Sequence, residues 1–297
     1  MTARAEAAST ESRGVLLQGQ NAAIGANMKS RGDVRLNTSY WLIVGDIYGD
    51  FAEHERVMTA TRCKHYLDTT SLRSDERFIL GQGVGASDAD EIRAKLRSSG
   101  HPDALYDFDE LAPISLTHKQ TDRHVLISCL RNVGPRAYQS QLVLDDASDR
   151  LCDHVTGQHL AGMVLIEASR QAALGVLECE YKNTSQISWG LTWSSTQVQF
   201  LGYIFPVPLT LTAKVSEPVG TRSESRIPVN VVVDWDQLGK PVCEMALTGI
   251  LLERAFLAKL EVKRARQAVD ALWAKYGHDS GLDEPRSQVN VGIDVAR

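Results

Sequence analysis

The chain has 297 residues, enough for a well-buried core in one large domain or in two ordinary ones. With 43% hydrophobic residues, 23% charged residues and a net charge of −5, it has the composition of a soluble globular protein. A mildly acidic chain lacks the basic surface that binding to DNA or RNA requires, so we expect no nucleic-acid partner.

Changes in composition divide the chain into four regions. Residues 1–13 carry scattered charges without the apolar core of a secretory signal, so we expect a disordered tail there. Residues 14–110 form an N-terminal region, and residues 111–255 form a second region that is rich in strand patterns. Residues 256–297 add a helix and a polar tail.

The cysteines indicate the redox compartment. They are scattered along the chain, with no Cys-x-x-Cys pair, and their odd number fits reduced thiols better than a disulfide framework. We therefore expect a cytoplasmic protein. The five residues are Cys63, Cys129, Cys152, Cys179 and Cys243.

A glycine-rich turn is the most distinctive feature of the N-terminal region. The candidate strand 77–80 leads into Gly-Gln-Gly-Val-Gly-Ala at residues 81–86, and a capping pattern then predicts a helix to about Arg97. Strand, Gly-x-Gly-x-x-Ala and helix outline a dinucleotide-binding turn, but no strand–helix–strand alternation is visible around it. We expect a plain glycine turn, with a nicotinamide or flavin site as the alternative.

A buried helix lies at the centre of the second region. Residues 163–177 are almost uniformly apolar and are interrupted by Glu167, Ser169, Arg170 and Gln171. A helix that is apolar around most of its circumference is a buried helix rather than an amphipathic surface helix. It is too short and too interrupted to span a membrane, which needs about 20 apolar residues, so we expect no membrane partner.

Three of these polar residues share one face of the helix. Glu167, Arg170 and Gln171 stand at positions i, i+3 and i+4. A buried carboxylate is costly unless it is paired or hydrogen-bonded. The face therefore either lines a pocket or carries a closed ion pair that only holds the core in register, and the helix alone leaves both interpretations open.

Further polar residues converge on the start of this helix. Asp153, His154 and His159 arrive within a turn or two of it, and Gly162 and Met163 open it. A small residue at a helix N-terminus lets a ligand approach the free N–H groups. Two histidines five residues apart with no third histidine nearby do not make a zinc site, so we predict no metal and no cofactor.

Strand patterns follow the helix. Trp and Leu alternate with polar residues from 189 to 193, and the same period of two recurs at 209–215 and 229–235. The turn 236–241 then leads into the apolar run 242–252. These patterns predict one buried helix followed by four antiparallel strands.

The last predicted element is a helix from Glu253 to Tyr276, where apolar residues alternate with Lys and Arg. We expect it to pack on the domain or on a partner subunit. A basic helix lying on a membrane surface is the alternative, but Glu253, Glu261 and Asp270 dilute its positive charge.

The central motif resembles that of a known family. The run Asp153-His154-Val155, followed by Gly162-Met163-Val164-Leu165-Ile166-Glu167-Ala168-Ser169-Arg170-Gln171-Ala172-Ala173, resembles the signature of the A-factor biosynthesis hot-dog family, the γ-butyrolactone hormone synthases of actinomycetes. More distantly it is similar to the Gly-Val-Leu-x-x-Glu-Ala-x-x-Gln helix of hot-dog β-hydroxyacyl-thioester dehydratases. Thr117-His118-Lys119 resembles the opening of the family's domain.

The resemblance covers roughly residues 110–255 and implies an α+β hot-dog fold. In this fold a curved antiparallel sheet wraps a long buried helix. Members that make butyrolactones carry two hot-dog repeats, each with its own Glu-x-x-Arg-Gln helix, and residues 1–110 contain no second copy. We therefore expect either a homodimer or a double hot-dog in which residues 14–110 are a degenerate second unit.

The resemblance also implies an acyl-thioester enzyme of secondary metabolism, an acyltransferase of the γ-butyrolactone type. It would pass a β-ketoacyl group from a thioester, on an acyl carrier protein or coenzyme A, to a hydroxyl of a small phosphorylated acceptor such as dihydroxyacetone phosphate. Glu167 would be the general base, Arg170 would bind the phosphate or the developing oxyanion, and His154 would be a second acid or base. The substrate side would be formed by Asp153, His159, Gly162, Met163 and Gln171.

Two alternatives remain. A hot-dog dehydratase or thioesterase acting on carrier-bound polyketide or fatty acyl intermediates would use His154 and Glu167 as its acid and base. Arg170 argues mildly against dehydration, because a neighbouring guanidinium lowers the pKa of Glu167. The other alternative is a non-catalytic ligand-binding or partner module whose polar face is a closed ion-pair network.

Overall fold

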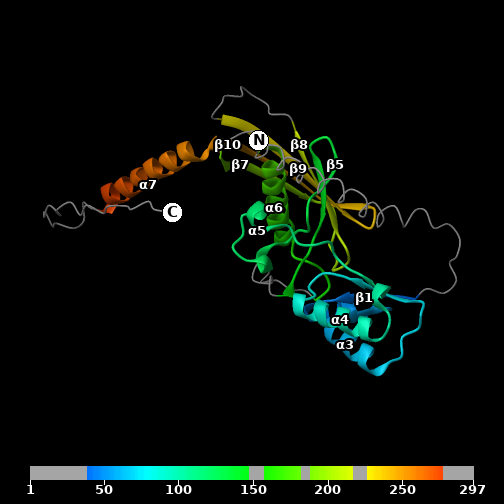
Figure 1. Cartoon of the computed structure of the whole chain (residues 1–297). Coiled ribbons are helices and arrows are strands. Elements are labelled where there is room, and N and C mark those ends of the chain that lie inside the picture. The colour runs from blue at the N-terminus through cyan, green and yellow to red at the C-terminus, as the bar shows by residue number, and fades with distance from the viewer. Residues whose placement is uncertain (1–38, 147–156, 182–187, 217–225, 277–297) are drawn as a thin grey trace, which may run out of the picture.

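The computed structural model describes residues 39–146, 157–181, 188–216 and 226–276. Figure 1 shows two units and a final helix that projects from them. We refer to residues 39–106 as the parallel unit, and to the described residues between 111 and 253 as the antiparallel unit.

The parallel unit is a four-stranded sheet with strand order β2-β1-β3-β4, and every strand pair in it is parallel. Helix α3 connects β2 to β3, and helix α4 connects β3 to β4. Its elements are β1 (Ser39–Val44), η1 (Asp46–Tyr48), η2 (Phe51–Glu53), β2 (Val57–Thr59), α3 (Ala60–Thr69), β3 (Glu76–Leu80), α4 (Ala86–Ser98), η3 (Pro102–Ala104) and β4 (Leu105–Tyr106).

This architecture corrects two expectations for the N-terminal region. It is not a degenerate hot-dog unit, because a hot-dog sheet is antiparallel and wraps one helix, whereas these parallel strands alternate with helices. The sequence shows no strand–helix–strand alternation around the glycine turn, but the structure has one. Strands of three residues (β2) and two residues (β4) are too short to show a period of two.

The glycine turn between β3 and α4 contacts the antiparallel unit. Gly83 donates its N–H to the Leu144 carbonyl oxygen at 2.7 Å, and Ala86 at the start of α4 donates its N–H to Asp145 Oδ2 at 3.1 Å. A Cβ on Gly81 would lie 2.3 Å from the Pro206 carbonyl oxygen, so a larger residue does not fit there. The turn is a plain glycine turn whose N–H groups meet protein rather than a phosphate.

The antiparallel unit is a six-stranded sheet with strand order β5-β6-β8-β9-β10-β7, and all its strand pairs are antiparallel. The order of helix α6 followed by four strands agrees with the sequence-based prediction. Its elements are α5 (Ile114–Thr117), η4 (Asp122–His124), β5 (Arg131–Gly134), β6 (Ala137–Gln141), α6 (Gly162–Tyr181), β7 (Trp189–Phe200), β8 (Thr210–Ser216), β9 (Arg226–Gln237) and β10 (Lys240–Glu253).

Helix α6 packs on one face of this sheet (Figure 1). The alternating apolar residues of β9, from Ile227 to Trp235, are buried beneath it. Trp235 Nε1 donates a hydrogen bond of 2.8 Å to Ser169 Oγ, and both side chains are buried, so this contact fixes the position of the helix on the sheet. The hairpin between β9 and β10 turns at Leu238 and Gly239, which both have positive φ.

Helix α7 (Arg254–Tyr276) follows β10 directly and has no buried residue. In the described part of the chain, none of the helices has the length and apolar character needed to cross a membrane.

Candidate active site

The polar face of α6 is the candidate site, and Glu167 lies at its centre. Arg170, one turn further along the helix, donates from Nε to Glu167 Oε2 and from Nη2 to Glu167 Oε1, both at 2.8 Å. This is the bidentate geometry that makes an Arg–carboxylate pair strong. The side chains are only partly buried, with 20% of Glu167 and 33% of Arg170 exposed.

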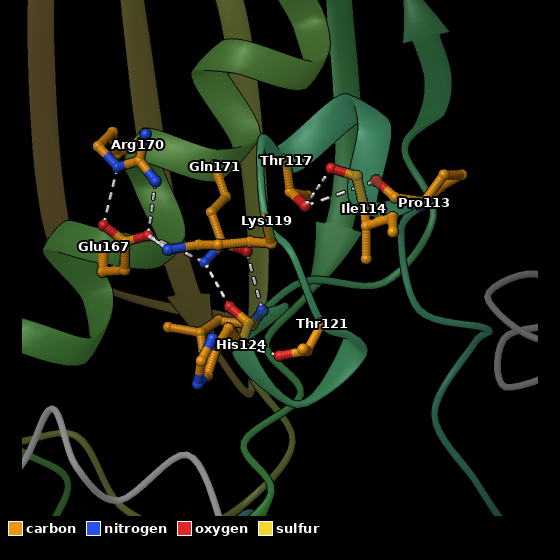
Figure 2. A network of polar contacts seen from close by, with 10 residues as sticks. Pro113, Ile114, Thr117, Lys119, Thr121, His124, Glu167, Arg170 and Gln171 are labelled. Carbon is orange, nitrogen blue, oxygen red and sulfur yellow. Dashed lines mark hydrogen bonds and ion pairs between the residues drawn. The ribbon is translucent and has the colours of Figure 1, made fainter.

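A second cation reaches the same carboxylate. Lys119 Nζ lies 2.5 Å from Glu167 Oε1, and the Lys119 side chain is 20% exposed. Figure 2 shows the Lys119 side chain extending toward α6 from the segment after α5. Among the described residues two positive groups therefore share one negative group, and these three side chains together carry a positive charge.

Gln171 connects this cluster to the backbone. Its side chain is fully buried, and its Oε1 accepts the N–H of Leu126 at 2.9 Å. Its Nε2 donates to the His124 carbonyl oxygen at 3.0 Å and to Glu167 Oε1 at 3.1 Å. Because both amide hydrogens are used, Gln171 holds the site in place and has no donor left for a substrate carbonyl.

The surroundings of Glu167 determine its charge. Partial burial by itself raises the pKa of Glu167, but hydrogen bonds from Arg170, Lys119 and Gln171 outweigh burial and bring the pKa to about 2. The hydrogen bond to Glu167 raises the pKa of Arg170. The carboxylate is therefore ionised, and a group with so low a pKa is a weak base near neutral pH.

Lys119 is the member of this cluster that the sequence analysis did not assign. Short helix α5 ends at Thr117. His118, which follows it, adopts a left-handed conformation (φ 54°) and turns the chain so that Lys119 reaches α6. The Lys119 N–H returns to the Ile114 carbonyl oxygen at 3.1 Å. Only the resemblance of Thr117-His118-Lys119 to the family's domain opening drew attention to this segment.

The structure places the other predicted residues differently. Met163, one turn before Glu167, is 60% exposed. A Cβ on Gly162 would lie 2.6 Å from the Phe200 ring, so this glycine allows a close contact between α6 and the end of β7. The His159 ring packs against Tyr203, with ring centroids 5.3 Å apart. Asp153 and His154, like Cys152, lie outside the described residues.

The described residues also bear on two other kinds of site, a metal centre and an acyl-binding cavity. No group of three or more His, Cys, Asp or Glu side chains suited to a metal ion occurs within residues 39–146, 157–181, 188–216 and 226–276. A cavity of about 450 Å³ lies between the two units, and its lining includes Val84, Arg93 and Val125 but neither Glu167 nor Arg170. An acyl-binding cavity in front of Glu167 therefore stays a prediction.

The comparisons with known proteins address the second region. Residues 103–252 match the family model described as the A-factor biosynthesis hotdog domain. The match and the sheet topology confirm the expected α+β hot-dog fold. A search of the curated proteins gives no match.

Solved structures show weaker likenesses. A putative thioesterase, a phenylacetic acid degradation-related protein from Ralstonia eutropha, is 18% identical over 41% of this chain and 83% of its own, with a TM-score of 0.32. The dehydratase heterocomplex ApeI:P from Xenorhabdus doucetiae is 16% identical over 50% of this chain and 97% of the matched chain, with a TM-score of 0.38. The HP0420 homologue from Helicobacter felis is 19% identical over 48% of this chain and 91% of its own, with a TM-score of 0.34.

Proposed function

Because the chain belongs to the A-factor biosynthesis hotdog family, we propose that it is an acyl-thioester enzyme of secondary metabolism. The reaction would transfer a β-ketoacyl group from the thioester of an acyl carrier protein or coenzyme A to a hydroxyl of a small phosphorylated acceptor. The observation that carries the proposal is the pair of cations, Lys119 and Arg170, held on one carboxylate on the partly buried polar face of α6.

In this proposal the two cations bind negative charge. Arg170 uses one edge of its guanidinium on Glu167, and a guanidinium has further N–H donors on its other edge. Lys119 likewise has more donors than the one that meets Glu167. A phosphate on the acceptor, or the oxyanion that forms when a hydroxyl attacks a thioester carbonyl, fits this donor set.

We propose for Glu167 a role different from the general base expected from the sequence. A carboxylate with a pKa of about 2 takes up a proton poorly at neutral pH, so it is a poor general base. We propose that Glu167 instead positions Lys119 and Arg170 and keeps them close together despite their like charge. His154 is then the candidate base on the acceptor hydroxyl, and Met163 is a candidate apolar contact for the acyl chain.

The low pKa of Glu167 also disfavours one of the two alternative functions, dehydration. A dehydratase would need Glu167 to exchange protons near neutral pH, which the surrounding donors disfavour. In a non-catalytic module Lys119 and Arg170 would need only the hydrogen-bond donors that contact Glu167, and their remaining donors would have no role. We also propose a homodimer, because the chain has one motif where butyrolactone-forming relatives have two.

Product analysis tests the proposal. The purified full chain is incubated with a β-ketoacyl thioester, on coenzyme A or on an acyl carrier protein, together with dihydroxyacetone phosphate, and the products are identified by mass spectrometry. We expect a new ester that contains both substrates. Loss of water would indicate a dehydratase, free acid would indicate a thioesterase, and unchanged substrates with both carriers would indicate a non-catalytic module.

A further inference from the structure

Most of helix α7 is exposed, which sets it apart from the other helices of the described residues. It has 23 residues and extends away from both units (Figure 1). Only its beginning is attached, where the Arg254 N–H donates to the Ser188 carbonyl oxygen at 2.8 Å and Leu257 packs against Gly190. From Glu261 to Tyr276 every residue is exposed. A helix of this length depends on packing of its apolar face for most of its stability.

Six exposed apolar side chains of α7 form one stripe, which we call the α7 seam; exposed Phe256 and Trp273 lie outside it. Its members are separated by alternating steps of four and three residues, the heptad spacing of helices that pair along their length. The seam lies away from Leu257 and Leu260, which are partly buried. It consists of Ala258, Val262, Ala265, Val269, Leu272 and Tyr276.

We propose that the α7 seam pairs with the α7 seam of a second copy of this chain, and that the two helices run antiparallel. In a parallel pair each residue would meet its own equivalent, so Ala258 would face alanine and Tyr276 would face tyrosine. Small layers leave cavities, and large layers are overpacked. In an antiparallel pair each small residue meets a larger one. The three kinds of layer are Ala258 with Tyr276, Val262 with Leu272, and Ala265 with Val269.

The charges beside the seam agree with this orientation. In the antiparallel register Glu261 of each copy lies beside Lys275 of the other, and Lys259 lies beside the ring of Trp273, which allows cation–π contact. One unfavourable pair, Arg266 with Arg266 of the second copy, lies in water, where repulsion is weak. A parallel pair would place Arg254 beside Lys259 twice, and this repulsion would offset its two Glu261–Arg266 pairs.

The geometry of the chain is also compatible with antiparallel pairing. A helix of 23 residues is about 34 Å long. Antiparallel helices would place the two bodies at opposite ends of the pair, so the bodies would not collide. A contact of three heptads is small, so we expect a dissociation constant in the micromolar range.

Light scattering after size-exclusion chromatography tests the seam. The full chain should be a dimer at high micromolar concentration and should dissociate on dilution. The double variant Val269→Glu/Leu272→Glu should be monomeric, with a dissociation constant raised at least about a hundredfold, because it places carboxylates in an apolar contact. The matched control Lys263→Glu/Gln267→Glu, on the opposite face of α7, should remain dimeric. Circular dichroism confirms that both variants keep their fold.

Several outcomes would overturn the proposal. A wild-type chain that is monomeric at every concentration would contradict it. Sedimentation of this monomer with anionic phospholipid vesicles would indicate that α7 binds a membrane surface instead. A seam variant that dimerises as tightly as the wild type would also contradict the proposal, since the contact would then lie elsewhere, for example along the edge of β7. Equal loss of dimer in the control would show that charge rather than the seam determines pairing.

Charge reversal tests the orientation. In the antiparallel pair Glu261→Lys and Lys275→Glu should each weaken dimerisation about fivefold at low salt, and the double variant should restore it. In a parallel pair Glu261 would lie beside Arg266 instead, so Lys275→Glu would have no effect and the double variant would not recover. That second result would overturn the antiparallel arrangement.

Discussion

Replacing Glu167 by glutamine removes the negative charge that holds Lys119 and Arg170 together. The pKa of Glu167 falls from an ordinary value of 4.5 to about 2, and each unit corresponds to about 1.4 kcal/mol. The ionised carboxylate therefore contributes about 3 kcal/mol to the free energy of unfolding at pH 7. We expect Glu167→Gln to lose about that amount, because its two cations remain partly buried without a counter-charge.

The pH dependence follows from the direction of the shift. A lowered pKa means that the stabilisation is complete above the unfolded-state pKa and is lost as the pH falls toward the folded-state value of about 2. The difference between wild type and Glu167→Gln should therefore shrink from about 3 kcal/mol at pH 7 to about 1 kcal/mol at pH 3. Urea denaturation followed by tryptophan fluorescence measures both values.

The matched control is Glu178→Gln, on the same helix. Its carboxylate meets the partly exposed His118 Nε2 at 3.2 Å. We expect a smaller loss than for Glu167→Gln at pH 7, because a bidentate guanidinium binds a carboxylate more strongly. The reasoning would be refuted if Glu167→Gln were as stable as the wild type at pH 7. It would also be refuted if the loss were the same at pH 3 as at pH 7.

Three further predictions concern turnover and packing. Lys119→Met should lower turnover at least about tenfold while Lys119→Arg retains most of it, because the positive charge of the side chain is what the site needs. Steady-state rates of ester formation measure this, and equal rates in both variants would contradict it. Ser169→Ala leaves the buried Trp235 N–H without an acceptor, so urea denaturation should show a loss of about 1–3 kcal/mol, and a neutral effect would argue against the contact. Gln82→Leu removes the hydrogen bonds of 3.0 and 2.9 Å to the backbone of Leu142 and Leu144 that join the two units. Proteolysis between the units should accelerate, and an unchanged rate would show that these hydrogen bonds do not hold the two units together.

The sequence predicted the antiparallel unit well because its elements are long and periodic. Strand β9 alternates buried and exposed residues over most of its 12 residues, and α6 is apolar through its interior. The face formed by Glu167, Arg170 and Gln171 followed from helical spacing alone. These are local relationships, and local patterns are what a single sequence records.

The unpredicted features depend on contacts between distant segments. The parallel unit is built from strands as short as two residues, which carry no periodic signal, so its strand–helix–strand order was not recognised. The glycine turn matched a phosphate-binding outline, yet its N–H groups meet Leu144 and Asp145 in the other unit. The helical spacing places Gln171 on the same face as Glu167. It does not reveal that the Gln171 side chain also bonds to the backbone of residues 124 and 126.

Lys119 shows why the chemistry of the site could not be read from the helix alone. Glu167 and Arg170 by themselves form a neutral pair, which suits a structural ion pair as well as a catalytic one. The third charge arrives from outside α6 through the left-handed turn at His118, and it changes the cluster from neutral to positive. An excess positive charge in a partly buried site is unfavourable unless an anion compensates it. We therefore propose that a substrate brings negative charge to this site, rather than that the ion pair is complete without one.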